Sequence, residues 1–468
     1  MTEGIRDQPA SPRLRRANED GGLRTEDGDE KSAIRDQKSA VRHDESVVRR
    51  IGSLSTINHQ PSTFCDIALL TGGGDKPYAL GIATALTSRG IHLDFIGSDD
   101  LISPELLADP RVHFLNLRGD QGPEATAVVK VRRVLNYYVR LVRYAAMARP
   151  KLFHILWNNK FQFLDRTLLM LYYRLLGKRI AFTAHNVNAA KRDLNDSFLN
   201  RISLKIQYRL SDHIFVHTEK MKSELVSGFS VRKGKVSVIP FGINETVPNT
   251  SLSTAEAKRQ VGVSSSEKAL LFFGNIAPYK GLEYLVAAFA EVLKRDRSYR
   301  LIIAGRPKGS EEYWKQIQRD ITRRGIRDRI IERIEYVPDE ETELFFKAAD
   351  ALILPYTRIF QSGVLLLGYA FGLPAIAADV GTLKEEIIEG ETGFAFKSED
   401  SSDLAKKIRQ YFVSELFGEL DGRRSQIKEY ANEQYSWSKV ATITTSVYSN
   451  LLTSHHRRSG FGTQKAAR

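Results

Sequence analysis

The stretch from Phe346 to Phe396 reads FKAADALILPYTRIFQSGVLLLGYAFGLPAIAADVGTLKEEIIEGETGFAF and carries the clearest folding pattern of this chain. Its first apolar run, Ala351 to Pro355, is short and ends in a proline, which is typical of a buried parallel strand. Val364 to Phe371 is apolar nearly all round and predicts a buried helix, which Gly372-Leu373-Pro374 ends. Ala375 to Ala378 predicts the next strand. This order of elements forms a βαβ unit, so we expect an α/β fold with parallel sheets.

The loop between that strand and that helix ends in Gln361-Ser362-Gly363. Unpaired backbone N–H groups and the positive end of the helix dipole favour an anion such as phosphate at this position. Gly363 would let a ligand approach the backbone closely. Doubly wound sheets also contain such loops without a ligand, so the spacing alone leaves both interpretations open. Further along, Val380-Gly381-Thr382 predicts a turn into a short acidic helix.

Length and composition point to a globular protein of two domains with tails: 468 residues, 42% of them hydrophobic. No apolar run approaches the roughly 18 to 20 residues of a membrane-spanning helix, and the charged amino terminus does not resemble a signal peptide. The one cysteine, Cys65, excludes an internal disulfide and argues against a thiolate metal site, as expected in the cytoplasm. The net charge of +13 predicts attraction to nucleic acid, anionic lipid or the phosphates of a substrate.

The charged, aromatic-poor residues at the amino terminus cannot bury enough surface to offset the entropy of ordering, so we expect them to be disordered. Composition and the strand and helix patterns divide the rest of the chain. The predicted segments are a disordered tail at 1–60, a first Rossmann-like domain at 63–247, a linker at 248–267, a second Rossmann-like domain at 268–425, a crossover helix at 426–452 and a basic tail at 453–468.

The first domain opens with a predicted strand, Asp66 to Leu70, a glycine loop that contains Gly73-Gly74-Asp75, and a predicted helix, Pro77 to Arg89. This opening resembles a Rossmann-type half. It lacks the complete G-x-G-x-x-G spacing, so we do not predict NAD binding. A ligand-binding loop and a plain turn between strand and helix both remain open.

Two later stretches of the first domain, Lys130 to Arg149 and Phe161 to Arg179, mix arginines with aromatic and aliphatic residues. Basic amphipathic helices of this kind suit a membrane surface. They also suit a helical layer whose basic side chains extend along apolar surface to reach water. Both interpretations remain open, and the excess of arginine adds contact with an anionic membrane surface to the expected partners.

Two polar positions lie where ligands bind in α/β sheets. His185-Asn186 follows a predicted strand that begins at Arg179, although a single histidine is more often structural. Lys280 stands at the amino end of the predicted helix Leu282 to Lys294. A cation opposes the helix dipole at that position unless an anion binds there too, so Lys280 is a candidate anion ligand.

The motifs PY…QSGV…YAFG-P-IA-DVG-L-E-I-G-TGF in the stretch quoted first resemble the donor-binding half of glycosyltransferase family 4. These are retaining sugar-nucleotide transferases with a GT-B fold, and the resemblance is to a subgroup with a QSGV loop. It implies two Rossmann-like domains that face a cleft, with C-terminal helices that cross back to the first domain. Asp212 to Thr218 resembles the family's D-x-I-x-V-H-T segment, and Ser436-Trp437-Ser438 matches its terminal helices.

The resemblance also implies roles for individual residues. Lys280 would bind the donor's diphosphate and His185 would lie next to the transferred sugar, so these two are the candidate catalytic residues. The other implied donor-binding residues are Gly274, Asn275, Val337, Gln361, Ser362, Gly363, Val364 and Glu385. The implied acceptor-side residues are Gly73, Gly74, Asp75 and Asn186. For Glu385, a helix-capping role is the open alternative.

The chain departs from the family pattern at three positions. Family 4 enzymes generally carry two glutamates eight positions apart, but Ile359 and Leu367 stand at those places. Asn275 replaces the usual arginine after the first glycine of the second domain. We expect the Gln361-Ser362-Gly363 loop to supply neutral donors and backbone amides instead.

The predicted function is transfer of a sugar from a nucleotide-sugar donor to a glycan or lipid-linked acceptor, in polysaccharide or glycoconjugate synthesis. The resemblance implies a retaining reaction, and we expect no cofactor. No metal is predicted, because the chain has no convincingly placed DxD pair and Asp99-Asp100 is the nearest approach to one. The expected location is the cytoplasm, with peripheral contact to the inner face of the cell membrane.

Three other functions remain open at this point. An inverting transferase on the same fold would need a general base such as Asp193 or Asp75. A catalytically silent binding or scaffold protein is favoured by the missing glutamates and opposed by Lys280. Nucleic-acid binding is compatible with the charge, but no recognition motif accompanies it, so no nucleic-acid partner is predicted.

Overall fold

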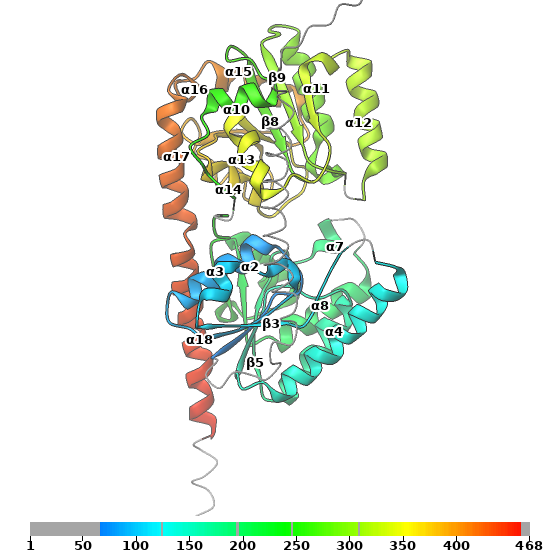
Figure 1. Cartoon of the computed structure of the whole chain (residues 1–468), viewed down its shortest axis with the longest axis vertical. Coiled ribbons are helices and arrows are strands. Elements are labelled where there is room, and N and C mark those ends of the chain that lie inside the picture. The colour runs from blue at the N-terminus through cyan, green and yellow to red at the C-terminus, as the bar shows by residue number, and fades with distance from the viewer. Residues whose placement is uncertain (1–65, 123–124, 193–195, 245–246, 308, 460–468) are drawn as a thin grey trace, which may run out of the picture. The chain divides into compact units, whose positions relative to one another are not determined.

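The computed structural model describes residues 66–122, 125–192, 196–244, 247–307 and 309–459. These residues form two parallel β-sheets covered by helices (Figure 1). The predicted α/β fold with two Rossmann-like domains is therefore confirmed. The predicted disordered tail at 1–60 and the candidate base Asp193 lie outside the described residues.

The first sheet has seven parallel strands in the order β3-β2-β1-β4-β5-β6-β7. The strands are β1 (Ile67–Leu70), β2 (Leu93–Gly97), β3 (Val112–Asn116), β4 (Leu152–Ile155), β5 (Arg179–Thr183), β6 (His213–Val216) and β7 (Val236–Val238). Ile67 pairs with Leu93 of β2 on one side and with Leu152 of β4 on the other. The strand order reverses between β1 and β4, and ligands of doubly wound sheets bind beside such a switch point.

The helices of this first half connect strands that all run the same way. They are α2 (Lys76–Thr87), α3 (Pro104–Ala108), α4 (Ala127–Met147), α5 (Gln162–Leu164), a π-helical turn (Asp165–Leu169), α6 (Met170–Leu175), α7 (Ala189–Arg192), α8 (Phe198–Leu210) and α9 (Glu219–Phe229). Short 3-10 segments lie at Asp99–Leu101 and Lys233–Lys235. Helix α4 is the longest of them and is drawn in cyan in Figure 1.

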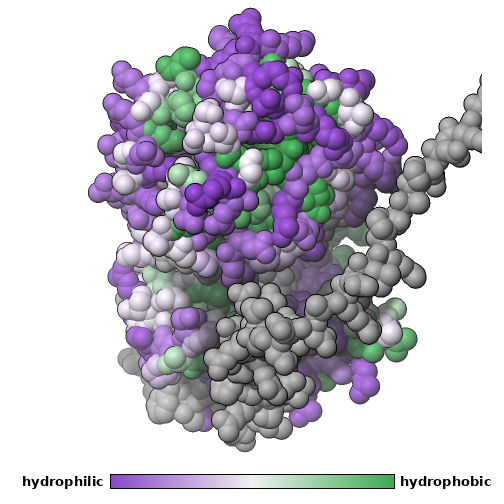
Figure 2. Space-filling model, turned by 45° about the horizontal axis from the view of Figure 1, so that its top comes forward, coloured by the Kyte–Doolittle hydropathy of each residue, from purple (hydrophilic) through white to green (hydrophobic). Residues whose placement is uncertain are grey.

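Alternate residues of the first sheet enter two separate cores. In β1, Ala68 and Leu70 belong to one hydrophobic cluster and Ile67 and Leu69 to the other. This follows from the two-residue period of a strand, whose successive side chains point to opposite faces. On the face of the molecule in Figure 2, hydrophilic residues prevail and smaller hydrophobic areas lie among them.

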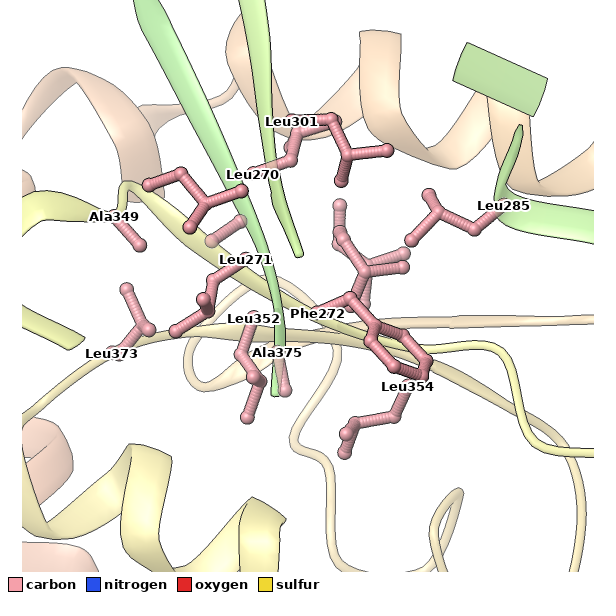
Figure 3. Close-up of a cluster of buried hydrophobic side chains, with 14 of the residues drawn as sticks. Leu270, Leu271, Phe272, Leu285, Leu301, Ala349, Leu352, Leu354, Leu373 and Ala375 are labelled. Carbon is pink, nitrogen blue, oxygen red and sulfur yellow. The ribbon is translucent and has the colours of Figure 1, made fainter. Parts of the chain in front are cut away.

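The second sheet has six parallel strands in the order β10-β9-β8-β11-β12-β13. The strands are β8 (Lys268–Phe273), β9 (Tyr299–Ala304), β10 (Ile330–Arg333), β11 (Ala351–Leu354), β12 (Ala375–Ala378) and β13 (Gly393–Phe396). Its core is one continuous cluster, and Figure 3 shows Leu270, Leu271 and Phe272 of β8 beside Leu352 and Leu354 of β11. Strands that are apolar on both faces are expected where helices cover both sides of a sheet.

Nine helices of the second half are described. They are α10 (Thr254–Val261), α11 (Leu282–Leu293), α12 (Glu311–Arg324), α13 (Asp339–Ala348), α14 (Gly363–Ala370), α15 (Ser401–Phe412), α16 (Glu415–Gly418), α17 (Leu420–Tyr435) and α18 (Trp437–Ser459). Short 3-10 segments lie at Pro278–Lys280 and Arg327–Arg329. Helix α10 lies within the stretch 248–267 that the sequence predicts as a linker.

The predicted crossover helix consists of two helices, because Ser436 adopts an extended conformation between α17 and α18. Ile427 of α17 belongs to the core of the second sheet, whereas Val440 and Tyr448 of α18 belong to a core of the first. Trp437 begins α18, and its indole N–H donates to the carbonyl of Ile243 at 2.8 Å. Helix α18 continues to Ser459, beyond the predicted end of the crossover helix at 452.

The structure differs from the sequence-based prediction in three elements. Strands β4 and β13 were not predicted. The helical stretch Phe161 to Arg179 ends at Leu175, because Gly177 takes a positive φ of 73° that ends the helix before β5. Helix α13 begins at Asp339, and Pro338 occupies the cap position without a side-chain hydrogen bond.

The short acidic helix expected after Gly381 is also absent, since residues 381–386 form successive turns. Thr382 directs both its backbone N–H and its hydroxyl to the carbonyl of Phe360, at 3.0 and 2.8 Å. This anchors the segment to the loop after β11. The helix-capping alternative for Glu385 therefore has no helix to cap.

Candidate functional site

Three loops of the second sheet lie at one edge of that sheet. They follow the neighbouring strands β8, β11 and β12, which are parallel, so their carboxyl ends share that edge. The loop after β8 runs from Gly274 to Lys280, and the loop after β11 contains Gln361 and Ser362. This edge is where open α/β sheets bind ligands.

Lys280 is the central cation of this edge and is only 6% exposed. Its ammonium Nζ donates to the carbonyl of Phe273 at 3.3 Å and lies 5.1 Å from the ring centroid of Tyr356. Among the described residues no carboxylate pairs with it, and burial lowers the pKa of Lys280. Burying an ammonium group away from a counter-charge is costly. The site is therefore prepared for an anion.

Gly274 brings the other predicted residues to Lys280. It has a positive φ of 94°, which disfavours a side chain. A Cβ atom built on Gly274 would lie 3.0 Å from Nζ of Lys280 and 3.6 Å from Cγ2 of Val364. The structure thus places Gly274, Lys280 and Val364, three of the candidate donor-binding residues, close together.

Ser362 begins helix α14, which starts at Gly363. The Ser362 hydroxyl accepts from the N–H of Leu365 at 3.3 Å and donates to the Tyr356 hydroxyl at 3.4 Å. Because Nζ of Lys280 lies over the Tyr356 ring, the amino end of α14 and the buried lysine share a neighbour. Free N–H groups at a helix start and a buried cation together suit a phosphate group.

Glu386 is a member of this edge that sequence reasoning missed. Its Oε1 lies 2.9 Å from Nε2 of Gln361 and 3.0 Å from Oγ1 of Thr382, and the residue is 7% exposed. Oε2 of Glu386 and Oε1 of Gln361 are buried and have no hydrogen-bond partner among the described residues. Burial raises the pKa of Glu386 to about 7. Glu385, the adjacent residue that was predicted to bind the donor, is exposed.

The remaining predicted donor-binding residues are spread more widely. Asn275 is exposed, as Glu385 is. Val337 is buried and packs in the core of the second sheet. Among the described residues, no side-chain contact joins Asn275, Glu385 or Val337 to Lys280.

In the first half, His185 lies in an aromatic cluster at the carboxyl end of β5. Its ring stacks on Trp157 with centroids 4.0 Å apart and planes within 4° of parallel. Tyr78 of α2 meets it edge-on at 4.6 Å. Trp157 lies two residues after the end of β4, so missing that strand hid this contact from the sequence analysis. The apolar run Leu152 to Leu156 was the available signal.

His217, which follows β6, fixes the protonation of His185. Its Nδ1 lies 3.2 Å from the carbonyl of Ile239, so a neutral His217 carries its proton on Nδ1. Its Nε2 lies 3.0 Å from Nδ1 of His185 and must accept a hydrogen bond from the N–H group at that atom. Burial lowers the pKa of His217 to about 4 and holds the pKa of His185 well below its usual value, so both rings are neutral at pH 7.

This arrangement leaves Nε2 of His185 as a hydrogen-bond acceptor. The atom is buried and has no partner among the described residues. Buried polar atoms are normally paired, so an unpaired one at the mouth of a sheet calls for a ligand group or a water. A hydroxyl group would satisfy it.

The glycine loop after β1 is held between two large side chains. A Cβ atom on Gly74 would lie 2.0 Å from the Trp157 ring, and one on Gly73 would lie 1.6 Å from Nη1 of Arg118. Asp75 caps helix α2 by accepting from the N–H of Tyr78 at 2.9 Å. Asn186 is half-buried in the turn after His185. The loop and His185 are therefore joined through Trp157.

Two further findings concern metals and membranes. The described residues contain no group of three or more metal-ligating side chains, and Asp99 instead hydrogen-bonds with Asn116. Within the same residues, none of the helices has both the length and the apolar character that crossing a bilayer requires.

Two family models match the chain, one in each half. Residues 72–247 match the model described as Glycosyltransferase Family 4. Residues 253–434 match the model described as Glycosyl transferases group 1. The first model covers almost all of the predicted first domain, 63–247. The second model covers the predicted second domain and nearly all of helix α17.

Among curated proteins, the chain is similar to enzymes named D-inositol 3-phosphate glycosyltransferase. It is 28% identical to that of Corynebacterium efficiens over 284 residues, which are 58% of this chain and 66% of the relative. The match to the Nocardia farcinica protein of the same name is also 28%, over 409 residues, 83% of this chain and 88% of the relative. The chain spans just under two thirds of the length of three corynebacterial relatives of that name.

Among solved structures, the chain is similar to sucrose-phosphate synthase of Thermosynechococcus elongatus. That TM-score is 0.67 at 20% identity, with 84% of this chain and 100% of the other covered. The structure of Anabaena HepE in complex with UDP-glucose gives a TM-score of 0.63 at 15% identity, with 82% and 99% covered. These similarities show that the chain has a GT-B fold.

Proposed function

Because a family 4 model and a group 1 glycosyltransferase model match the two halves of the chain, we propose that it transfers a sugar from a nucleotide-sugar donor to an acceptor hydroxyl. The observation that carries this proposal is Lys280, a buried cation without a carboxylate partner among the described residues. It lies beside the amino end of α14, and a diphosphate would supply the missing negative charge.

The barrier to transfer is departure of the nucleoside diphosphate. In the proposed reaction Lys280 and the amides around Ser362 and Gly363 stabilise the charge that develops on the leaving phosphate. Gly274 and Val364 shape the same space. In this proposal Gln361 contacts the donor while its side chain is held by the hydrogen bond to Glu386. The backbone of Val337 approaches the nucleotide base. The exposed side chains of Asn275 and Glu385 lie at the rim of the donor site.

On the sugar side, His185 provides a hydrogen-bond acceptor at Nε2 for a sugar hydroxyl. The leaving phosphate takes the proton of the acceptor on the face from which it departs, which gives retention of the anomeric configuration. Both histidines of the pair are neutral at pH 7, so the pair does not compete for that proton. Gly73, Gly74 and Asn186 form the acceptor side. No cofactor takes part in this scheme.

The acceptor in this proposal is a glycan or a lipid-linked intermediate of polysaccharide or glycoconjugate synthesis. A small phosphorylated polyol is the second candidate, because the curated relatives carry a name that specifies inositol 3-phosphate. The proposed location is the cytoplasm, with α4 and the segment 162–175 resting on an anionic membrane surface. Helix α4 carries Lys130, Arg132, Arg133, Arg140 and Arg143 and no acidic residue, which favours such contact.

The donor site is tested by thermal unfolding of the purified protein with UDP, GDP and their sugar conjugates. A ligand that binds only the folded state raises the unfolding midpoint. We expect one nucleotide to raise it, and the rise to disappear in Lys280→Ala and in Lys280→Met, which keeps the apolar stem. A folded wild type that responds to none of these nucleotides would overturn the transferase proposal and favour the scaffold alternative. Product analysis by NMR then distinguishes retention from inversion.

A further inference from the structure

Two surfaces of the first half fall outside the donor site and meet on helix α4. The first is a pocket of about 210 Å³ next to the acceptor-side glycine loop. Four of its lining side chains are cationic, namely Arg118, Lys130, Arg133 and Lys160, and one is a carboxylate, Asp120. Asp120 is already paired with Arg133 at 2.5 Å. A net positive charge therefore remains in the pocket.

Arg118 is the best-placed cation of this basic pocket. Its guanidinium lies directly on Gly73 and 5.3 Å from the ring centroid of Tyr137, which hold it in place. Its Nη1 is buried and has no hydrogen-bond partner among the described residues. A guanidinium N–H held in this way suits a phosphate or carboxylate oxygen.

The second surface is an open apolar groove of about 430 Å³. One wall is Tyr138, Val139 and Val142 of α4, and the other comes from the segment 162–175, which includes Leu168 and Tyr172. Val139 and Leu168 are 58% and 62% exposed. No acidic residue lines the groove, and Arg143 is its one charged lining residue.

The groove belongs to a larger concentration of exposed apolar side chains. Of the twenty large hydrophobic residues exposed in the described part of the chain, sixteen lie between Val128 and Ile202. Scattered apolar residues on a surface are normal, but a groove lined almost entirely by apolar and aromatic side chains marks an interaction site. It therefore calls for an apolar partner.

The basic pocket and the groove are adjacent, because Tyr138 lines both. Its hydroxyl donates to Asp165 at 3.0 Å, and its ring stacks on Phe161 with centroids 5.6 Å apart. The basic pocket in turn touches the glycine loop through Arg118. A molecule with an anionic end and a hydrocarbon end could occupy both surfaces at once.

We propose that the acceptor is an anionic amphiphile: its phosphate binds Arg118 in the basic pocket, and its hydrocarbon chain lies in the groove between α4 and the segment 162–175. This inference rests on the proposed function, since it names the class of acceptor for that reaction. The charge pattern opposes a second copy of this chain, because a twofold contact would bring the same arginines of α4 face to face. A peptide would bury backbone N–H and C=O groups against a wall of Val and Leu.

The test separates the two ends of the ligand with soluble probes. Decyl phosphate, n-butyl phosphate and decyl maltoside, each below its micelle concentration, are titrated calorimetrically into the full chain in the presence of saturating UDP. UDP occupies the donor site, so the phosphate probes report on the basic pocket. We expect decyl phosphate to bind at least tenfold more tightly than either single-ended probe.

Variants then assign each end to its surface. Arg118→Gln should reduce the affinity for decyl phosphate to that for decyl maltoside, and Val139→Asn with Leu168→Asn should reduce it to that for butyl phosphate. Val413→Asn and Arg295→Gln, exposed residues of the second half, are the matched controls and should change nothing. The midpoint shift with UDP must persist in every variant, which shows that the fold and the donor site are intact.

Three outcomes would overturn the inference. Decyl phosphate could bind no better than butyl phosphate, or Arg118→Gln could bind it as the wild type does. The chain could also sediment with phosphatidic acid vesicles while it ignores soluble decyl phosphate, which would mean a general membrane surface instead of an acceptor site. None of these results affects the UDP shift, so they leave the donor site and its test untouched.

Discussion

Nε2 of His217 lies 3.0 Å from Nδ1 of His185, and the two rings form a short relay that ends on the backbone carbonyl of Ile239. Each neutral histidine carries one ring proton, so the carbonyl at one end determines the protonation of both. In the proposed reaction, His217 therefore acts on the sugar through His185. It would be a positioning residue rather than a group that touches the sugar.

Removing that positioning should slow transfer without unfolding the protein. In His217→Leu the Nδ1 proton of His185 loses its acceptor, so the ring can protonate on Nε2 and no longer accepts from a sugar hydroxyl. The loss of one such hydrogen bond is worth roughly 1 kcal/mol, which predicts a fall in kcat of about fivefold to tenfold. Steady-state kinetics with the nucleotide sugar identified by thermal unfolding measure it.

His217→Gln is the matched control, because its side-chain oxygen can reach the position of Nε2 and accept from His185. It should recover most of the activity that His217→Leu loses, while KM for the donor changes little in both. Equal activity in the two variants would mean that the volume of the ring matters and its acceptor does not.

The amino end of α14 allows a second comparison, between two serine caps. Ser362 caps α14 and Ser253 caps α10, with hydroxyl to N–H distances of 3.3 and 3.2 Å. Replacing either serine by alanine should cost about 1 kcal/mol of unfolding free energy in urea. Only Ser362→Ala should also weaken binding of the nucleotide, severalfold, because its loop then loses the anchor that holds the amides in place. Equal nucleotide affinity in Ser362→Ala and Ser253→Ala would remove this loop from the donor site.

The sequence predicted the parts of this molecule in which the local pattern and the fold agree. Strands β8 and β11 are apolar runs closed by Gly274 and Pro355, and β12 is an apolar run that follows Pro374. Lys280 was chosen as a candidate anion ligand from electrostatics, because a cation at a helix start needs an anion, and from the family resemblance. The structure added that this lysine is buried.

Other features depend on contacts that no local pattern shows. Strand β4 is four residues long and lies between two amphipathic helical stretches, so its apolar run could not be told from theirs. Because β4 was not predicted, the stacking of Trp157 on His185 could not be predicted either. His217 has the same signal as His185, a polar residue after a strand, yet only the pairing of β5 with β6 brings the two together.

The acidic turn after β12 contains two adjacent glutamates, of which the structure buries one and exposes the other. A helix was predicted there, and Glu385 was chosen as the ligand. The segment is a series of turns tied to Phe360, which exposes Glu385 and buries Glu386. Burial is a tertiary property, so adjacent glutamates could not be distinguished beforehand.

Glu386 therefore makes the sharpest prediction about pH. The Thr382 hydroxyl lies 2.8 Å from the Phe360 carbonyl and 3.0 Å from Oε1 of Glu386. One hydroxyl proton cannot serve both oxygens, but a protonated Glu386 can donate to Thr382 while Thr382 donates to Phe360. This agrees with a pKa of about 7 for Glu386, raised by burial from 4.5.

The sign of the pH effect follows from that proton. Between pH 4.5 and 7 the folded protein keeps a proton that the unfolded chain has released, so the contribution of Glu386 to stability falls as the pH rises through this range. Above pH 7 the ionised group costs roughly 3 kcal/mol. Glu386→Gln, a neutral mimic, should raise the unfolding free energy at pH 8 and leave it nearly unchanged at pH 5, as urea titrations would measure. Glu385→Gln, the exposed neighbour, should have no effect at either pH, and an equal effect of both substitutions would refute a buried, protonated Glu386.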